Sequence, residues 1–437
     1  MDPLAEEISM LEIKSYRFNF EREPLVKPFS FKGGFFTEKW ILVTSVTSRS
    51  GVQATGLGGL AVLWSDPDVF FAHSETGGNV LMTAMAERAV RLLAGRSFRN
   101  PIEALDAVFP EIHEFGKILT GNQNLTKTFT LNSLVSLDLA LWTLFFRENQ
   151  LSTFDDLIPP EFRPALSVHQ QKLARVPVIS YNTSQEEILH LVDSGHFFLK
   201  IKLGQAGTTA EMLEKDRTRL KEVHETLAGR RTPHTRGGKI QYYLDANGRY
   251  PDKETLGRLI DSLDRMKILE QVALLEEPFP PEVRAEVSDL PVCLAADESL
   301  HGLSEVNERA DLGYKAMAIK PAGKTLSKSL QMVQAAQERG IPCFVADSAC
   351  IPLLLEWNKN VAARLKPFPG LEMGIIESHG EQTYKNWRGL AADLPIPGGG
   401  WVEPAEGIYH LDENFYKTSG GIFLPPGRYQ KFIEGKL

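Results

Sequence analysis

The sequence has few features that would tie the chain to a membrane, to nucleic acid or to an oxidising compartment. Its only cysteines are Cys293, Cys343 and Cys350, with no CxxC pair, so it has no disulfide framework and no sign of a zinc site. The start, MDPLAEEISM, lacks a signal-peptide pattern, and we expect no apolar run of membrane-spanning length. The net charge of −8 argues against nucleic acid or an anionic membrane as partner. We therefore expect a cytoplasmic protein.

The composition is that of a globular protein large enough for two domains. Apolar residues make up 43% and charged residues 24% of the 437 positions. The first 170 or so residues combine strand and helix patterns and predict an α+β unit. The predicted elements are a strand at 40–46, a glycine-rich loop at 51–59, and helices at 79–93 and 133–146, the second capped by Asn132 or Ser133.

From residue 176 the pattern changes to short apolar strands that alternate with amphipathic helices. We predict eight strands, at 176–182, 197–203, 241–247, 272–278, 292–299, 316–322, 341–348 and 373–378. Eight βα units favour a closed barrel over an open doubly wound sheet. No GxGxxG or P-loop follows the first strand, which disfavours a nucleotide-binding sheet.

Two segments do not fit the alternation of strands and helices. The basic stretch at 229–238, GRRTPHTRGG, is interpreted as an exposed loop, with a substrate or partner contact as the alternative. The tail after Pro395 is rich in glycine and proline and has no barrel unit left to build. We expect it to pack back on the first domain.

Charged residues stand near the ends of five successive predicted strands. Side chains alternate between the two faces of a strand, so the apolar residues at 199, 201 and 203 place Lys200 and Lys202 inside the barrel. The same alternation places further polar groups there, namely Asp245, Asn247, Glu276, Asp297 and Lys320. Barrel active sites lie at this end of the strands.

Buried charges at this position need partners. Bare charges in a barrel would cost several kcal/mol each, and three converging carboxylates would raise one another's pKa. A hard divalent ion, magnesium or manganese, relieves this repulsion. Each short motif has a simpler interpretation, since a lysine can snorkel to the rim and an aspartate can cap a helix. Five groups at one depth are harder to attribute to chance.

The order of these motifs resembles that of the enolase superfamily, within it the muconate-lactonising-enzyme subgroup of the mandelate racemase/muconate lactonizing enzyme family. The matching pieces are KIK at 200–202, DAN at 245–247, EEP at 276–278, ADES at 296–299, IK at 319–320 and LVSLDLALWTL at 134–144. The resemblance implies an α/β fold, a modified TIM barrel, (β/α)7β, at 171–395. It further implies an N-terminal α+β capping domain at 1–170, a C-terminal segment at 396–437 that returns to the cap, and a homo-oligomer.

The resemblance also implies residue roles. Asp245, Glu276 and Asp297 would bind Mg²⁺ or Mn²⁺, Lys202 and Lys320 would be acid/base groups on opposite sides of the substrate, and Lys200 would hold the substrate carboxylate. Glu298 would be a neighbour of the metal site and not a ligand. The chemistry implied is removal of the proton next to a carboxylate through an enediolate, whose charge the metal stabilises. The pKa of a free lysine is about 10.4. Burial, the neighbouring Lys200 and the metal are expected to lower the pKa of Lys202 toward the ~7–8 that suits a general base.

Several reactions remain open. Two lysines permit racemisation or epimerisation, whereas one supports cycloisomerisation or a syn elimination such as o-succinylbenzoate formation. Acid-sugar dehydration is disfavoured because strand six has Lys320. Dipeptide epimerases carry Asp-x-Asp on strand eight, where this chain has IIESHGE, so dipeptide epimerisation is in doubt.

The far end of a substrate is expected near the last strands and the cap. Glu377 and His379 are candidates for contacting this end, and the alternative for His379 is an ordinary loop residue. Asp347 and Ser348 on strand seven are candidates with the same alternative. Loops at 22–34 and 51–59 are expected to close over the substrate. Within the first loop, Arg22 and Lys27 are either anion contacts or surface residues.

Two other classes of protein were weighed. A non-catalytic metal or carboxylate binder on the same scaffold would be favoured by loss of a ligand or lysine, and none is lost. A sugar-phosphate or aldose enzyme would need a phosphate-binding glycine loop after strand seven, and 346–352 has no glycine. The sequence thus predicts enediolate chemistry on a small carboxylic acid of unknown identity.

Overall fold

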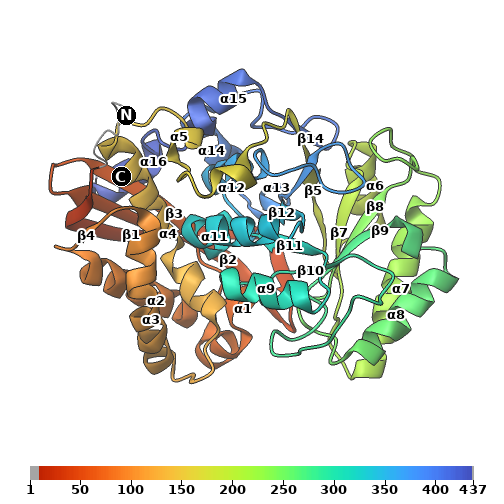
Figure 1. Cartoon of the computed structure of the whole chain (residues 1–437). Coiled ribbons are helices and arrows are strands. Elements are labelled where there is room, and N and C mark those ends of the chain that lie inside the picture. The colour runs from red at the N-terminus through yellow and green to blue at the C-terminus, as the bar shows by residue number, and fades with distance from the viewer. Residues whose placement is uncertain (1–8, 436–437) are drawn as a thin grey trace.

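The computed structural model describes residues 9–435 and has a cap beside a barrel (Figure 1). The cap contains a four-stranded sheet in the order β3-β2-β1-β4. Its strands are β1 (Leu11–Phe31), β2 (Gly34–Ser48), β3 (Gln53–Gly59) and β4 (Ser97–Phe98). Its helices are α1 (Val62–Ser65), α2 (Pro67–Leu93), α3 (Pro101–Thr120) and α4 (Lys127–Glu148). The short helices α5 (Phe154–Leu157) and η1 (Arg163–Leu166) then lead to the barrel.

The second sheet closes into a barrel through its first strand. Its order is β14-β5-β13-β12-β11-β10-β9-β8-β7-β6. Strand β14 (Ile408–His410) is added at one edge, next to β5. The segments β5 and β6 are one stretch of chain, interrupted only at Pro177, so β5 pairs with β13 while β6 pairs with β7. The strands are β5 (Lys172–Val176), β6 (Val178–Ile179), β7 (Phe198–Lys202), β8 (Gln241–Asp245), β9 (Val272–Glu276), β10 (Leu294–Ala296), β11 (Ala316–Ile319), β12 (Cys343–Val345) and β13 (Gly374–Glu377). The predicted modified TIM barrel with an α+β cap is confirmed.

Helices connect all but one pair of barrel strands. They are α6 (Gln185–Asp193), α7 (Thr209–Leu227), α8 (Lys253–Arg265), α9 (Leu303–Asp311), α10 (Pro321–Lys324), α11 (Leu326–Glu338) and α12 (Pro352–Ala362), with the short η2 (Leu269–Gln271) before β9. The described stretch 277–293 between β9 and β10 has no helix. The expectation of a helix at every connection is wrong here because four prolines, at 278, 280, 281 and 291, interrupt helical hydrogen bonding.

The C-terminal segment contacts both the barrel and the cap. Its elements are α13 (Gly380–Thr383), α14 (Trp387–Ala392), β14 (Ile408–His410), α15 (Glu413–Thr418), η3 (Ser419–Gly421) and α16 (Gly427–Ile433). Strand β14 adds antiparallel to β5. Farther on, the ring of Phe423 stacks on Phe146 of α4 at 3.7 Å, and Arg428 pairs with Glu21 of β1. The domain boundaries at 170 and 395 stay predictions.

The glycine-rich stretch 51–59 is mostly a strand, contrary to the predicted loop. Its residues 53–59 form β3, which packs on α4. A Cβ on Gly56 would lie 2.2 Å from the carbonyl oxygen of Ser136 and 2.3 Å from the nitrogen of Ala140. Glycine is therefore required here by the close approach of strand and helix. This segment is not a lid over a substrate.

Helix α4 begins earlier than predicted. Thr126, and not Asn132 or Ser133, caps it, since the Thr126 side chain accepts a hydrogen bond from the backbone of Phe129 at 3.1 Å. Helix α2 likewise starts at Pro67 and is kinked at Ser74. The first barrel strand starts at Lys172, before the predicted 176, and Pro177 interrupts it.

By length and composition alone, helix α4 is long and apolar enough to cross a membrane. The expectation that the chain has no apolar run of this length did not take this helix into account. However, 94% of its most apolar window is buried inside the protein. It joins cap and barrel: the Asp138 carboxylate accepts hydrogen bonds from the backbone of Leu326 at 2.7 Å and Ser327 at 3.2 Å in α11. Burial raises the pKa of Asp138 to about 7.

Asn132 of α4 fixes the segment that follows β3. Its Oδ1 accepts a hydrogen bond from Ala61 at 2.8 Å, and its Nδ2 donates to the carbonyl oxygens of Gly59 at 3.2 Å and Gly323 at 3.1 Å. A single buried amide therefore connects the cap segment at 60–64 to the turn after β11.

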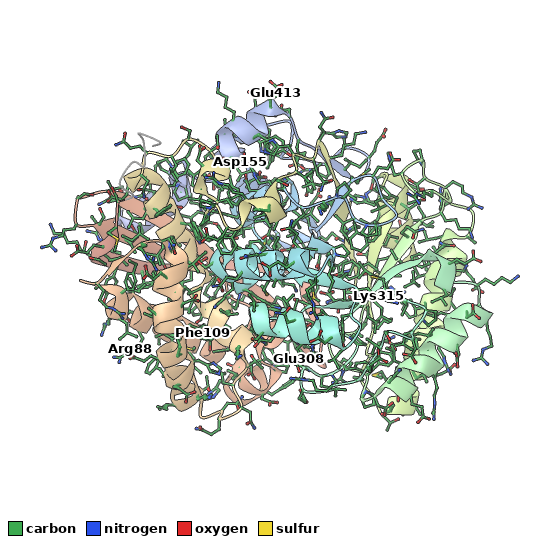
Figure 2. The ribbon with its side chains drawn as sticks, viewed as in Figure 1. Arg88, Phe109, Asp155, Glu308, Lys315 and Glu413 are labelled. Carbon is green, nitrogen blue, oxygen red and sulfur yellow. The ribbon has the colours of Figure 1, made fainter. Side chains whose placement is uncertain are left out.

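Charged side chains cover much of the exterior, as Arg88 of α2 and Glu413 of α15 illustrate (Figure 2). The basic stretch 229–238 precedes β8 and contains no helix or strand. It therefore lies at the amino end of the barrel strands, opposite the end where their charged side chains gather. Within it, only Thr232 and Thr235 are buried.

Candidate active site

A pocket lies between the cap and the carboxyl ends of the barrel strands. The barrel forms what we call its floor, with Lys200, Lys202, Lys320, Asp347, Glu377 and His379 among the lining residues. The cap forms what we call its roof, which includes Phe29, Phe31, Phe36, Lys39, Trp64 and Phe70. The residues predicted to be catalytic therefore line one pocket, beneath aromatic side chains that the sequence analysis did not identify.

Lys200 is the centre of an ion-pair cluster on the floor. Its Nζ lies 2.9 Å from Asp245 Oδ2, 2.7 Å from Glu276 Oε2 and 2.9 Å from Glu377 Oε2. Burial opposes its charge, but these carboxylates outweigh burial and hold the pKa of Lys200 well above its ordinary value. The buried ammonium is thus a permanent positive charge.

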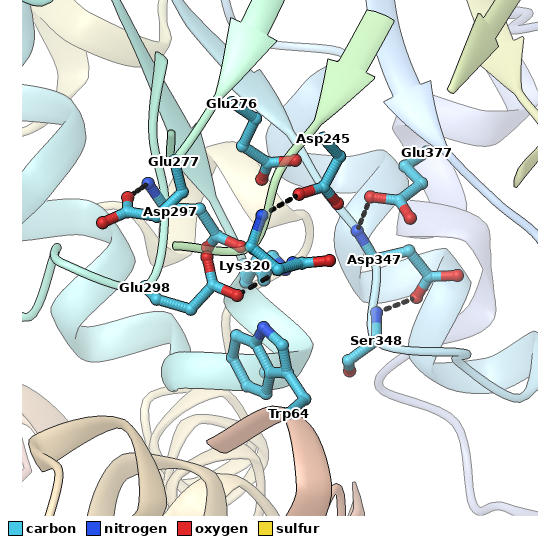
Figure 3. A network of polar contacts seen from close by, with 12 residues as sticks. Trp64, Asp245, Glu276, Glu277, Asp297, Glu298, Lys320, Asp347, Ser348 and Glu377 are labelled. Carbon is cyan, nitrogen blue, oxygen red and sulfur yellow. Dashed lines mark hydrogen bonds and ion pairs between the residues drawn. The ribbon is translucent and has the colours of Figure 1, made fainter. Parts of the chain in front are cut away.

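Lys202 and Lys320 approach the pocket from opposite strands. Strands β7 and β11 are four places apart in the ring. The Nζ of Lys202 lies 2.5 Å from Asp245 Oδ2 and 2.8 Å from Asn247 Oδ1. The Nζ of Lys320 lies 2.6 Å from Asp297 Oδ2 and 4.4 Å from the centre of the Trp64 ring (Figure 3).

The pKa of Lys320 is raised in this arrangement. Burial alone would lower it, but the carboxylates of Asp297 and Glu276 raise the pKa of Lys320 above its ordinary value. The charge of this lysine is therefore set by the carboxylates around it. A cation held by the same carboxylates would act in the opposite direction.

Asp245, Glu276 and Asp297 lie at the ends of neighbouring strands β8, β9 and β10, and all three are fully buried. Burial raises the pKa of Asp245, but Lys200 and Lys202 outweigh it and hold this pKa below its usual range. Burial, followed by the charge of Asp245, raises the pKa of Glu276 well above its ordinary value. The Tyr243 hydroxyl donates to Glu276 Oε2 at 2.5 Å, whereas Glu276 Oε1 has no hydrogen-bond partner within residues 9–435.

The chemistry of these three carboxylates fits a hard divalent ion. They supply only oxygen atoms, which magnesium prefers, and Glu276 Oε1 is a buried acceptor without a donor. As the side chains stand, however, no group of three or more His, Cys, Asp or Glu in the described chain is arranged around a metal position. Lysines hold the carboxylates instead. The ligand roles of Asp245, Glu276 and Asp297 stay predictions.

Lys324 is a further buried lysine beside Asp297 that does not line the pocket, and the sequence analysis missed it. It is fully buried, its Nζ lies 3.1 Å from Asp297 Oδ1, and it also donates to the backbone carbonyl of Asp297. It follows Lys320 by one turn of α10 (PAGK), so a lysine one turn beyond the strand-six lysine was the available signal.

Glu298 and Asn247 form a second layer beside the carboxylates. Glu298 Oε1 lies 3.1 Å from Lys32 Nζ of the cap and accepts a hydrogen bond from Asn247 Nδ2 at 2.9 Å. Asn247 has a left-handed backbone with φ of 45°, which asparagine tolerates better than most residues. Since Asn247 Oδ1 also accepts from Lys202, it connects that lysine to Glu298.

Asp347 is held by backbone groups after β12. Its Oδ1 accepts hydrogen bonds from the backbone of Ser348 at 2.7 Å and of Cys350 at 2.9 Å. Glu377 Oε2 in turn accepts from the backbone of Asp347 at 2.9 Å. Figure 3 shows these groups on the side of Lys320 that faces away from Glu298.

His379 lies in the loop between β13 and α13, is buried and lines the pocket, and its functional role stays a prediction. Its Nε2 accepts a hydrogen bond from the backbone of Ala349 at 3.2 Å, and its Nδ1 lies 3.1 Å from the Thr383 hydroxyl. That hydroxyl donates to the His379 carbonyl, so Nδ1 carries the proton. Burial lowers the pKa of His379 to about 3, which makes it a neutral group.

Arg22 and Lys27 do not line the pocket. Arg22 pairs with Glu38 of β2 at 2.7 Å, and Lys27 pairs with Glu187 of α6 at 2.8 Å, with both partners about half exposed. The pocket is instead lined by the ends of β1 and β2, where FSFKGGFF at 29–36 carries four phenylalanines around a glycine turn. That density of aromatic residues in a turn was the signal for the roof.

The fold and the site define an α/β-barrel protein with lysines and carboxylates at its strand ends. Residues 184–397 match the family described as enolase C-terminal domain-like. A search of curated proteins found no match. The family match confirms the predicted resemblance to the mandelate racemase/muconate lactonizing enzyme group of the enolase superfamily.

Solved structures with the same fold cover nearly the whole chain at low sequence identity. A mandelate racemase/muconate lactonizing protein from Herpetosiphon aurantiacus is 17% identical with a TM-score of 0.61, covering 92% of this chain and 96% of its own. A dipeptide epimerase from Enterococcus faecalis V583, complexed with Mg and L-Leu-L-Tyr, is 18% identical with a TM-score of 0.62, covering 92% and 98%. An N-succinyl Arg/Lys racemase from Bacillus cereus ATCC 14579 is 16% identical with a TM-score of 0.59, covering 86% and 89%.

Proposed function

We propose that this protein is a magnesium-dependent isomerase, a racemase or epimerase, which removes and returns the proton next to a carboxylate. The observation that carries the proposal is the placement of Lys202 and Lys320 on opposite strands around one pocket. A proton taken by one lysine and supplied by the other inverts the carbon between them. The racemase and epimerase among the structural relatives support the same reaction class.

Each group of residues in the pocket has a separate role in the proposed reaction. Lys200 on the floor is assigned to hold the substrate carboxylate. Asp245 and Asn247 orient Lys202, while Asp297 orients Lys320, so that each amine is held at one side of the α-carbon. Trp64 and the roof phenylalanines exclude water from the carbanion face. Magnesium bound by Asp245, Glu276 and Asp297 would supply stabilisation of the charge that develops on the substrate carboxylate.

The test is exchange of the α-proton. Pools of N-acylamino acids, dipeptides, hydroxy acids, sugar acids and lactones are incubated in deuterium oxide with magnesium, and loss of the α-proton signal is followed by proton NMR. The expected result is exchange of one pool member, abolished by EDTA and restored by magnesium. Lys202→Ala and Lys320→Ala should each lose inversion, whereas the exposed control Lys239→Ala, whose lysine pairs with Glu270, should not.

The outcomes separate the remaining reactions. Exchange that persists without Lys320 indicates one-base chemistry, either cycloisomerisation or syn elimination, and overturns the two-base proposal. Exchange that is indifferent to EDTA contradicts the metal requirement. Absence of exchange in every pool, together with no magnesium binding by calorimetry, leaves a non-catalytic carboxylate binder as the better description.

A further inference from the structure

One buried cation of the pocket plays no part in the proposed reaction. Lys39 lies on β2 of the cap, is only 2% exposed, and lines the pocket. Within residues 9–435 its Nζ makes neither a hydrogen bond nor an ion pair. A buried ammonium without a partner is costly, so its presence requires an explanation.

The groups nearest to Lys39 do not neutralise it. Asp347 forms no ion pair with Lys39, and its Oδ1 accepts hydrogen bonds from the backbone amides of Ser348 and Cys350. The Cys350 thiol is buried, which raises its pKa well above the ordinary value and keeps it neutral. Lys320 adds a second positive charge from the floor. Burial, only partly offset by Cys350 and Asp347, lowers the pKa of Lys39 to about 8, so it is mostly charged at neutral pH.

The other charged groups lining the pocket are compensated or easily protonated. Glu38 is bound by Arg22 and by Trp40 Nε1. Burial raises the pKa of Glu75 to about 7, which removes much of its charge. The floor lysines each have carboxylate partners at 2.5 to 2.9 Å. Among the described lining residues, Lys39 is therefore the cation without an anionic partner.

The surroundings of Lys39 indicate what the anion is attached to. The same pocket is lined by the apolar rings of Phe29, Phe31 and Phe36. Two more buried polar atoms of the pocket, Trp64 Nε1 and Asn79 Oδ1, also have no hydrogen-bond partner in the described chain. An occupant with an apolar middle and an anionic end would pair with Lys39, and its oxygens could accept from Trp64 Nε1, whereas Asn79 Oδ1 requires a donor.

We propose that Lys39 binds a second carboxylate of the substrate, so that the substrate is a dicarboxylic acid whose two acid groups are separated by an apolar segment. This inference rests on the proposed function for the placement of the reacting carboxylate at Lys200. The cap then selects the substrate by charge as well as by shape. Two carboxylates at opposite ends also fix which carbon lies between Lys202 and Lys320.

The test compares pairs of acids of equal length. Binding of glutarate, adipate and suberate is measured by calorimetry against pentanoate, hexanoate and octanoate, using a Lys202→Ala variant that keeps Lys39 but cannot turn over. The expected result is at least 10-fold tighter binding of one diacid than of its monoacid. Lys39→Met in the same background should abolish that preference, Lys39→Arg should retain part of it, and the exposed control Lys239→Met should leave it unchanged.

Thermal unfolding of the ligand-free protein gives a second readout. Replacing an unpaired buried ammonium by the similar-sized, uncharged methionine removes a cost, so Lys39→Met should melt at a higher temperature than the parent. A lower melting temperature would mean that Lys39 is a structural ion-pair partner, and would overturn the proposal.

The two proposals fail in different ways. Equal binding of diacids and monoacids, or a diacid preference that survives Lys39→Met, overturns the role of Lys39 and leaves the isomerase proposal untouched. A Lys39-dependent preference without any α-proton exchange by the unmutated protein overturns the isomerase proposal and leaves the anion site standing.

Discussion

The floor and the roof of the pocket treat charge differently. On the floor each lysine has a carboxylate within 3 Å, as with Lys200 and Glu276 at 2.7 Å and Lys320 and Asp297 at 2.6 Å. The roof is rich in aromatic rings and includes Lys39, for which residues 9–435 provide no hydrogen-bond or ion-pair partner. A self-compensated network retains its geometry without a ligand and suits the chemical step. An uncompensated charge acquires its partner from the substrate and suits recognition.

Replacing Glu276 by glutamine breaks the floor network and should have the largest effect. It removes a carboxylate beside Lys200 and one of the proposed metal ligands. We expect α-proton exchange to fall about 10³-fold or more, equivalent to roughly 4 kcal/mol of barrier. Calorimetric titration with magnesium should show weaker binding. The matched control is Glu270→Gln on the exposed η2 turn, and unchanged exchange in Glu276→Gln would contradict the proposed role.

Asp138→Asn examines a buried carboxylate that lacks the lysine partners of the floor. Its pKa is raised by burial to about 7, so the protonated form is favoured in the folded state. The stability that it contributes is present below the unfolded pKa and is lost as pH rises through about 7. Relative to Asp138→Asn, the unmutated protein should lose about 2–4 kcal/mol of unfolding free energy between pH 4 and 8. Urea unfolding at several pH values measures this, and a pH-independent difference would refute it.

Phe31→Ala tests whether the roof contributes to substrate binding and not to the chemical step. The Phe31 ring lies 5.4 Å from the Nζ of Lys202 and faces the pocket, but takes no part in proton transfer. We expect KM to rise about 10-fold, from a loss of roughly 1–2 kcal/mol of apolar contact, with a smaller change in kcat. Phe71→Ala, at an exposed phenylalanine nearby, is the control. A decrease confined to kcat would instead assign Phe31 a role in the chemical step, as proposed for the floor residues.

Lys27→Ala should have the smallest effect. Lys27 pairs with Glu187 across the cap and the barrel, but both side chains are about half exposed. Such pairs contribute about 0–1 kcal/mol, so the melting temperature and α-proton exchange should hardly change. A large loss of exchange would show that this surface pair controls the position of the roof.

The floor could be predicted from the sequence because strand geometry is regular. Side chains alternate along β7 to β11, and the ends of parallel strands meet at one edge, so motif order was enough to bring Lys202, Asp245 and Lys320 together. The roof could not be predicted in this way. Lys39 lies on a cap strand whose facing direction depends on how the cap docks, and the packing of Gly56 against α4 is visible only in three dimensions.

The remaining differences have similar causes. Lys324 lies one helical turn beyond the strand, where alternation no longer applies. The missing helix after β9 follows from prolines that each have a weak signal alone, and the cap of α4 at Thr126 depends on a local hydrogen bond. The pKa of Lys320 depends on which carboxylates lie near it, which is a property of the tertiary structure.

The amide of Asn132 has a consequence for redesign of the pocket. It bonds both to the roof segment, at Gly59 and Ala61, and to Gly323 just beyond Lys320, so the spacing between roof and base is set by backbone contacts and not by the side chains that line the pocket. Substitutions at Phe29, Phe31, Phe36 or Lys39 should therefore change the shape and charge of the pocket while Lys202 and Lys320 keep their positions. The roof side chains can thus vary while Asn132 keeps the roof at a constant distance from the floor.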